Sequence, residues 1–335
     1  MKIGKIELDA PLALAPMAGV TDLPFRLICR ELGAGMTVSE MVSAKGLLYK
    51  NVKTTEMLRI DPGERPTAIQ LFGSVPEELA EAAKIVEASG ADVIDFNMGC
   101  PVVKVVNNHE GSALMKNPLL AHNILAAMVK AVGIPVTVKF RAGWDAEHRN
   151  AVEIAKAAEE AGVAAVAVHG RTREQFYEGK ADWSIIKAVK SAVKIPVFGN
   201  GDIFSVGAGL RMLQETGCDG LMVGRGADGN PWLFRQLKAA LKGETAPEAT
   251  IRERMAMLVR HMDMLIEFKG EYIAVKEMRR HVSSYLKGMP HATDFRGRFH
   301  KLDTREQMLA LMQEYEECAA EYYLEEKQFH QDHSK

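Results

Sequence analysis

Residues 93–101 read Val93-Ile94-Asp95-Phe96-Asn97-Met98-Gly99-Cys100-Pro101. The apolar start of this stretch predicts a short buried strand, and the cysteine follows on a tight turn at the carboxyl end of that strand. A thiol in this position is placed for chemistry rather than for packing. The alternative is a small buried residue in a turn, which is the commoner role of an isolated cysteine. Polar residues at several other strand ends favour the first interpretation.

Seven further runs of similar character recur along the chain between helical stretches. Strands that alternate with helices at this spacing predict right-handed βαβ units and a parallel sheet. Eight such units in about 240 residues fit a closed (β/α)8 TIM barrel of the α/β class better than an open sheet. The predicted strands cover residues 12–15, 36–39, 67–71, 93–96, 136–140, 164–168, 197–198 and 220–223.

Helical signals separate these strands. Ser74 and Glu77 have the spacing of a capping box before residues 79–88. Residues 151–160 are rich in alanine and glutamate, which favours a helix.

The pattern changes after Gly243. Thr250 and Glu253 have capping-box spacing, three apolar stripes with helical periodicity follow, and Thr304 is expected to cap the third. The sequence therefore predicts a barrel over 1–243 and a smaller all-helical C-terminal domain over 244–335. The stripes are Ile251, Met255, Leu258, Val259, Met262, Leu265 and Ile266; Tyr272, Val275, Met278 and Val282; and Met308, Leu311, Met312, Tyr315, Ala319 and Tyr322.

Composition excludes several classes of protein. The chain has 335 residues, 47% of them hydrophobic, which allows a large core and is ordinary for a soluble globular protein. Its apolar runs are too short to span a membrane, and its N-terminal residues lack a secretion signal. The four cysteines are scattered without a CxxC pair, which argues against a metal cluster or a disulfide framework. We expect a cytoplasmic protein in a reducing compartment, without a membrane or an obligate protein partner.

Charge is uneven along the chain, although the net charge is only −2. Residues 269–305 contain nine Lys or Arg against four Asp or Glu, and three histidines in addition. Such a segment is either an anion-binding face or a solvated helical surface with charges of both signs.

Polar and cationic residues follow the predicted strands in order. In a barrel of this kind the carboxyl ends of the strands carry the chemistry. Each residue has an ordinary structural explanation by itself, but eight coincidences at one rim are much less expected than one. The strand ends carry Pro16-Met17-Ala18-Gly19, Glu40, Gln70, Asn97 with Cys100, Lys139 with Arg141, His169 with Arg171, Asn200-Gly201-Asp202, and Gly224-Arg225-Gly226.

The last two strand ends form the corner where this fold usually binds phosphate. Glycines allow backbone N–H groups to approach an anion, and Arg225 can add a charge-assisted contact. A lysine and a glutamine on neighbouring strands suit a planar ring with carbonyls and ring nitrogens. This combination fits flavin mononucleotide (FMN), although a phosphorylated sugar also satisfies it.

With these residues in view, the chain resembles the tRNA-dihydrouridine synthase family, and its motif spacing is most similar to the bacterial B type. The most specific match is Asn97-Met98-Gly99-Cys100-Pro101, followed by Lys104 and Gly111-Ser112-Ala113-Leu114. The resemblance covers nearly the whole chain. The remaining matches, in order, are Pro16-Met17-Ala18-Gly19-Val20-Thr21-Asp22, His169-Gly170-Arg171-Thr172-Arg173, Gly199-Asn200-Gly201-Asp202 and Gly229-Asn230-Pro231-Trp232.

The resemblance implies a barrel that binds FMN, reduced by NADPH or NADH, and that saturates the C5–C6 bond of a uridine in tRNA. It implies that hydride reaches C6 from flavin N5 and that Cys100 gives the proton to C5. Asn97 and Arg171 are candidate uracil contacts, Lys104 is a candidate phosphate contact, and segment 269–305 would grip the tRNA backbone. The implied FMN contacts are Pro16, Met17 and Ala18 along the flavin, Gln70 and Lys139 at its ring, His169 as a further flavin contact, and Asn200, Gly201, Asp202, Gly224 and Arg225 at its phosphate end.

One segment departs from the family pattern. Many relatives have a glycine-rich stretch where this chain has Asn107-Asn108-His109-Glu110 before Gly111, in a loop expected to lie over the substrate. Three other functions stay open on the residues alone. They are a flavin enzyme for a small molecule such as dihydroorotate or an enone, a lyase that uses Lys139 as a Schiff-base amine, and a non-catalytic RNA-binding module.

Overall fold

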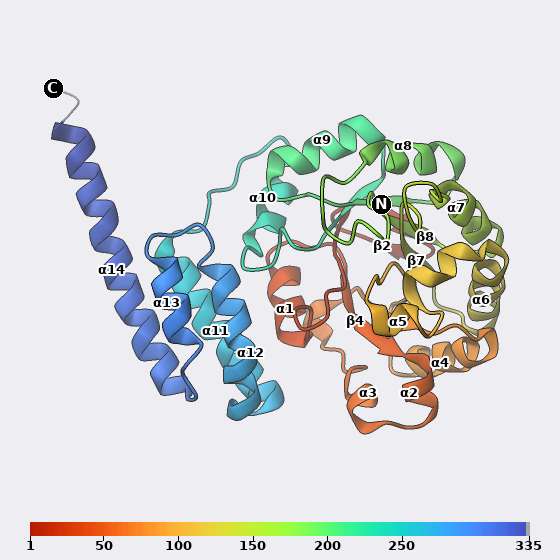
Figure 1. The fold of residues 1–335 in the computed structure, drawn as a ribbon, viewed down its shortest axis with the longest axis horizontal. Helices are drawn as coiled ribbons and strands as arrows, with labels where there is room; N and C mark the ends of the chain where they lie inside the picture. The colour runs from red at the N-terminus through yellow and green to blue at the C-terminus, as the bar shows by residue number, and fades with distance from the viewer. Residues whose placement is uncertain (333–335) are drawn as a thin grey trace. The chain divides into compact units, whose positions relative to one another are not determined.

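The computed structural model describes residues 1–332, with side chains described as far as Ala319 and at Tyr322. An eight-stranded parallel sheet with the order β3-β10-β9-β8-β7-β6-β5-β4 forms its centre (Figure 1). Ala13 of the first strand bridges to Met36 beside the last, which closes the sheet and confirms the predicted barrel. The strands are β3 (Leu12–Leu14), β4 (Thr37–Ser43), β5 (Thr67–Phe72), β6 (Val93–Met98), β7 (Val136–Arg141), β8 (Ala165–His169), β9 (Val197–Asn200) and β10 (Gly220–Val223).

Helices follow the strands and cover the outside of the barrel (Figure 1). The predicted capping box of Ser74 and Glu77 is wrong, because α4 is capped by Val75 without a side-chain bond and starts at Pro76. A two-stranded hairpin, β1 (Lys2–Ile3) and β2 (Ile6–Glu7), precedes the barrel and was not predicted. The helices are α1 (Leu23–Glu31), α2 (Ala44–Leu48), α3 (Val52–Glu56), η1 (Pro62–Glu64), α4 (Pro76–Ala88), α5 (Val103–Val106), η2 (Gly111–Lys116), α6 (Pro118–Ala131), α7 (Ala151–Glu160), α8 (Trp183–Ala192), α9 (Val206–Thr216) and α10 (Trp232–Ala240).

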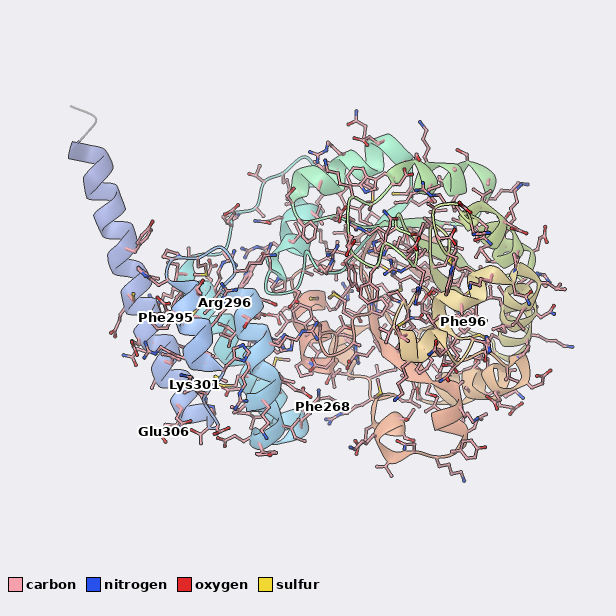
Figure 2. All side chains as sticks on the ribbon, viewed as in Figure 1. Phe96, Phe268, Phe295, Arg296, Lys301 and Glu306 are labelled. Atoms are coloured by element: carbon pink, nitrogen blue, oxygen red, sulfur yellow. The ribbon has the colours of Figure 1, made fainter. Side chains whose placement is uncertain are left out.

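Strand β6 shows how the barrel sorts its side chains. Ile94, Phe96 and Met98 belong to the large apolar core between strands and helices, and Phe96 is labelled in Figure 2. Val93 belongs to a smaller, separate cluster, formed mainly by residues of the barrel strands, that lies on the interior side of the barrel. Because side chains alternate along a strand, Asp95 lies on the same interior side as Val93.

Contacts divide the chain into two compact units, Met1–Ala227 with Leu233–Thr245, and Asp228–Trp232 with Ala246–Lys335. The second unit is helical, as the sequence predicts, and Thr250 and Glu253 do form a capping box. Tyr272 is 71% exposed, so its place in the second apolar stripe was wrong. The helix α13 was not predicted. The helices of this unit are α11 (Ile251–Lys269), α12 (Glu271–Tyr285), α13 (Ala292–Phe299) and α14 (Arg305–Asp332).

Segment Asp228–Trp232 belongs to the helical unit, although the sequence placed it within the barrel range. Gly229 has a φ of +72°, and a Cβ there would lie 2.2 Å from the backbone of Ser284 in α12. Trp232 packs edge-on against Tyr285, with ring centroids 6.1 Å apart. Within residues 1–332, no helix is both long enough and apolar enough to cross a membrane.

Candidate active site

The carboxyl ends of β6 to β9 bring most of the predicted site residues side by side. Asn97 lies opposite Lys139 in the register of β6 and β7. Arg141 lies opposite His169, which in turn lies opposite Asn200. These side chains therefore form a continuous band along the rim that carries the chemistry in barrels of this type.

The turn that carries Cys100 is fixed by three neighbouring side chains. Oδ1 of Asn97 accepts hydrogen bonds from the backbone N–H groups of Gly99 (3.2 Å) and Cys100 (3.0 Å). The hydroxyl of Ser112 donates to the Cys100 carbonyl at 2.9 Å. Nε of Arg141 donates to the Gly99 carbonyl at 2.7 Å. The position of the thiol is thus set by β6, β7 and η2 together.

Gly111 fits closely against the same turn. Its φ is +60°, a conformation that other residues adopt at a cost. A Cβ on Gly111 would lie 2.9 Å from the carbonyl oxygen of Cys100 and 3.1 Å from the Cys100 Cβ. The turn therefore requires glycine here for both backbone conformation and space.

The Cys100 side chain is half-buried, and its environment favours the neutral thiol. Burial raises the pKa of the Cys100 thiol above its usual value. A hydrogen bond from the backbone of Val102 and the charges of Arg141 and Lys139 oppose this shift without cancelling it. The thiol is therefore protonated at neutral pH, and the same groups can stabilise a thiolate when it forms.

Three basic side chains crowd this part of the rim. Burial and the neighbouring Arg141 lower the pKa of Lys139 to about 8. Burial lowers the pKa of Arg141 to about 10. The pKa of His169 lies well below its usual value, because burial and the charges of Lys139, Arg141, Arg171 and Arg225 disfavour its protonation. The Lys139 ammonium donates no hydrogen bond to any residue that the structure describes, so it is available to a ligand.

Gln70 is fully buried, with both ends of its amide occupied. Nε2 donates to Oδ2 of Asp95 at 2.6 Å, and Oε1 accepts from Nδ2 of Asn97 at 2.7 Å. The expected contact of Gln70 with a flavin ring stays a prediction. Sequence reasoning missed Asp95, although a charged residue inside an otherwise apolar strand was a usable signal.

The predicted phosphate corner has the backbone geometry of an anion site. Gly201 has a φ of +121° and Asp202 a φ of +58°. The backbone N–H groups of Gly201, Asp202 and Arg225 donate no hydrogen bond to the described part of the chain. Nδ2 of Asn200 donates to the Met222 carbonyl at 2.7 Å, which ties β9 to β10 beneath these donors. Free N–H groups grouped in this way suit a phosphate.

Two arginines of this corner have different surroundings. The Arg225 side chain is 40% exposed, and its guanidinium lies 4.4 Å from the ring centroid of Tyr177. Arg171 is 2% exposed and donates to the carbonyl of Gly179 at 2.6 Å and to the Asp202 carboxylate at 2.9 Å. These contacts occupy the Arg171 guanidinium, which argues against the direct uracil contact expected from the sequence.

The loop after β3 carries Pro16 and Met17, which are half-buried, and Ala18, which is exposed. The hydroxyl of Thr21 accepts a hydrogen bond from the Met17 backbone N–H at 2.9 Å. The backbone N–H of Gly19, in the same loop, donates to the Glu40 carboxylate of β4. The loop is therefore braced internally and bonded to β4 at Gly19.

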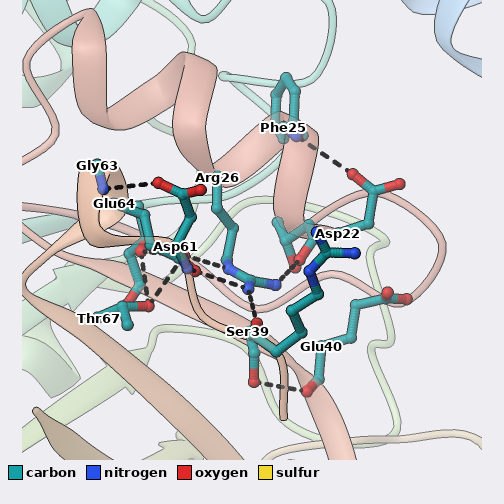
Figure 3. Close-up of polar contacts among 12 residues, drawn as sticks. Asp22, Phe25, Arg26, Ser39, Glu40, Asp61, Gly63, Glu64 and Thr67 are labelled. Atoms are coloured by element: carbon teal, nitrogen blue, oxygen red, sulfur yellow. Dashed lines mark hydrogen bonds and ion pairs between the residues drawn. The ribbon is translucent and has the colours of Figure 1, made fainter. Parts of the chain in front are cut away.

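A buried ion pair that the sequence did not predict holds the same loop (Figure 3). Nε and Nη2 of Arg26 donate to the two carboxylate oxygens of Glu64 at 2.6 and 3.0 Å. Nη1 of Arg26 donates to the Thr21 carbonyl at 3.2 Å. The partners are 38 residues apart in sequence, so no local motif announces them.

The segment after Cys100 forms α5 and a bonded turn. Lys104 is exposed on α5, where a phosphate contact stays a prediction. The backbone N–H groups of Asn108 and Glu110 both donate to the carbonyl of Val105, and His109 has a φ of +59°. Residues 107–110, where the sequence departs from the family pattern, therefore form a hydrogen-bonded turn.

The basic segment 269–305 is partly neutralised within the helical unit. Arg279 pairs with Asp303, and Arg305 with Asp263. Others of its cations are exposed, among them Lys301, which Figure 2 labels. Anion binding by the exposed cations of this segment stays a prediction. The further described ion pairs of this segment are Lys269–Glu277 and Arg298–Glu314.

Fold and rim together define a (β/α)8-barrel enzyme with a thiol and a cationic band at its carboxyl rim. Solved structures agree on the fold. Histamine dehydrogenase from Rhizobium sp. 4-9 has a TM-score of 0.57 at 15% identity, covering 79% of this chain and 50% of that one. The amine oxidase for 6-hydroxypseudooxynicotine from Pseudomonas geniculata N1 has a TM-score of 0.58 at 15% identity, covering 72% and 49%. This chain spans about half of each, and the similarity concerns the fold alone.

Sequence comparison gives the family. The dihydrouridine synthase (Dus) family model matches residues 13–322. The tRNA-dihydrouridine synthase B of Pseudomonas aeruginosa is 46% identical over 316 residues, 94% of this chain and 95% of that protein. The tRNA-dihydrouridine synthase B of Vibrio vulnificus is 44% identical over 316 residues, 94% and 98% of the two chains. The chain belongs to the dihydrouridine synthase family, which confirms the resemblance of its motifs.

Proposed function

We propose that this chain reduces uridine in tRNA to 5,6-dihydrouridine, with FMN at the carboxyl rim and NADPH or NADH as the reductant. The observation that carries the proposal is the position of the Cys100 thiol, which lies on a hydrogen-bonded turn at the carboxyl rim near Arg141 and Lys139. The names of the curated relatives describe this product for those proteins. Family membership favours this function over the small-molecule flavoenzyme, the lyase and the non-catalytic RNA-binding module.

The rim residues fit FMN by the chemistry of their donors. The free N–H groups of Gly201, Asp202 and Arg225, with the exposed Arg225 guanidinium, suit its phosphate. The Lys139 ammonium, which donates no hydrogen bond within the described part of the chain, suits a ring nitrogen or carbonyl. Neutral His169 adds a further donor or acceptor. We assign Arg171 the role of holding Asp202 in place. When bound and reduced, FMN supplies a hydride to the uracil ring.

Cys100 supplies the proton that saturation of the C5–C6 bond also requires. Burial keeps the thiol protonated at neutral pH, so a proton is available at Sγ when the substrate is in place. The charges of Arg141 and Lys139 and the N–H of Val102 stabilise the thiolate that remains. Nδ2 of Asn97 donates to Oε1 of Gln70 at 2.7 Å and to Sδ of Met41 at 3.7 Å. The sulfur is a weak acceptor, so a uracil carbonyl can take its place.

Binding of tRNA is assigned to the helical unit. Exposed Lys276, Lys287 and Lys301 can contact phosphates, which makes the affinity depend on salt. A uridine inside folded tRNA must leave its stack to reach the barrel rim. A reducing, cytoplasmic setting is part of this proposal, because the mechanism needs Cys100 as a free thiol.

The function is tested with purified full-length protein, FMN, NADPH and an unmodified tRNA transcript. Nucleoside mass spectrometry should find dihydrouridine that increases with time and requires all three additions. The same protein should not oxidise dihydroorotate. If the protein does not bind FMN, or if the tRNA gains no dihydrouridine while dihydroorotate is turned over, the proposal is wrong.

A further inference from the structure

Asp95 is a buried carboxylate at the start of a hydrogen-bonded row that ends at the Cys100 turn. It is 2% exposed, on the interior side of β6. The hydroxyl of Thr137 donates to its Oδ1 at 2.7 Å, and Nε2 of Gln70 donates to its Oδ2 at 2.6 Å. Both carboxylate oxygens therefore have partners, as a buried polar group requires. Burial raises the pKa of the Asp95 carboxyl, and the hydrogen bonds from Thr137 and Gln70 and the charge of Lys139 oppose this shift.

The row has a direction that follows from donor and acceptor chemistry. Both oxygens of Asp95 accept hydrogen bonds in the structure, so the NH₂ group of Gln70 faces Asp95. Its carbonyl oxygen then faces Asn97 and accepts from Nδ2 at 2.7 Å. This leaves Oδ1 of Asn97 facing the turn, where it accepts from the N–H groups of Gly99 and Cys100. Reversal of the Asn97 amide would set its NH₂ group against the N–H groups of the turn. Reversal of the Gln70 amide alone would set its NH₂ group against that of Asn97.

We propose that Asp95 is a positioning residue, which orients the amides of Gln70 and Asn97 and thereby holds the Cys100 turn in shape. The importance of that turn for catalysis rests on the proposed function, whereas the row itself does not. The competing explanation is that Asp95 only fills space and satisfies its own hydrogen bonds. In that case the direction of the row would have no consequence at Cys100.

Two nearly isosteric substitutions separate these explanations. In D95N the new amide can keep its oxygen toward Gln70, because the Thr137 hydroxyl can accept from its NH₂ group. In T137V the carboxylate still accepts from Gln70. In the double variant D95N/T137V the NH₂ group of residue 95 has no acceptor at position 137, so it turns toward Gln70 and reverses the row. The proposal therefore predicts two mild single variants and one severe double variant.

The primary readout is the alkylation rate of Cys100 by iodoacetamide, followed on the Cys100 peptide by mass spectrometry in the full-length protein. This reaction needs neither reductant nor tRNA, so it judges the positioning role even if the proposed function fails. Dihydrouridine formation is measured in parallel. D92N is the matched control, because Asp92 precedes the same strand and its carboxylate accepts from the Thr67 N–H at 2.9 Å.

We expect D95N, T137V and D92N to alkylate within about threefold of the unsubstituted protein, and the double variant at least about tenfold faster, because its turn has lost hydrogen bonds. Dihydrouridine formation should fall in the same order. Additive effects in the double variant, or a D95N rate as fast as the double, would overturn the proposal. If the double variant does not fold, D95V takes its place. Fast alkylation of D95V supports the positioning role, and an unchanged rate overturns it.

Discussion

We predict that Lys139 lowers the free energy of unfolding of the FMN-free protein, because its ammonium is held at the rim for a ligand and not for the fold. Its ammonium is desolvated by burial, stands near Arg141, and makes no hydrogen bond with the residues that the structure describes. Lys139→Met keeps a long, flexible side chain and removes the charge. We expect the variant to unfold at higher urea concentration than the unsubstituted protein at neutral pH, while losing FMN affinity and activity.

The magnitude follows from the lowered pKa. The pKa of Lys139 is about 8 in the folded protein, against about 10.4 in an unfolded chain. A lowered lysine pKa penalises the folded state at low pH, so stability rises as pH increases from about 8 toward 10. The penalty that the substitution removes is about 3 kcal/mol at pH 7 and about 2 kcal/mol at pH 9.

The assay is urea unfolding of FMN-free protein at pH 7 and pH 9, with Lys104→Met as the control. Lys104 is exposed, so its substitution should change the free energy of unfolding by less than about 0.5 kcal/mol at either pH. The reasoning is refuted if Lys139→Met is less stable than the unsubstituted protein at pH 7. It is also refuted if the difference between the two proteins does not shrink at pH 9.

Three further substitutions test other parts of the site. Glu64→Gln deprives the buried Arg26 of its carboxylate and should lower the free energy of unfolding by about 3–5 kcal/mol in urea; a loss below about 1 kcal/mol would contradict the role given to the pair. Gly111→Ala should slow dihydrouridine formation by disturbing the thiol-bearing turn. Gly217→Ala is the control: Gly217 has a φ of +69° but open space around it, so its substitution should lower stability without slowing the reaction. Equal rates of dihydrouridine formation in the Gly111→Ala and Gly217→Ala variants would count against the close packing of Gly111 on the Cys100 turn. Lys301→Glu should weaken tRNA binding and reduce its salt slope by about one, measured by filter binding at several salt concentrations; an unchanged slope would remove Lys301 from the interface.

The barrel and its rim were predictable because their signals are local and periodic. Apolar runs that recur with helices between them specify the strands, and parallel strands gather residues such as Lys139 and His169 at one edge whatever their distance in sequence. The first residues of the helices were predicted less accurately than the strands. The capping box at Thr250 formed, but Pro76 started α4 and left Ser74 without that role. Its fixed φ suits the first helical turn without any side-chain cap.

The features that the sequence did not predict depend on contacts between residues that are far apart in the chain. The pairing of Arg26 with Glu64 depends on how α1 and η1 pack, and the hydrogen bonds of Arg171 depend on where the loop at Gly179 returns. A single sequence also does not show that Tyr272 ends an apolar stripe on the exposed side of α12. The direction of hydrogen bonds through Asp95 becomes visible only when three strands stand side by side.

The central claim is that the Cys100 thiol gives a proton to the substrate. The direct test is to mix FMN-loaded, pre-reduced protein with tRNA without oxygen and to follow flavin reoxidation by its visible absorbance. The unsubstituted protein should reoxidise as dihydrouridine forms. Cys100→Ala should bind FMN equally well but reoxidise at least about 100-fold more slowly. Equal rates in the two proteins would contradict the claim.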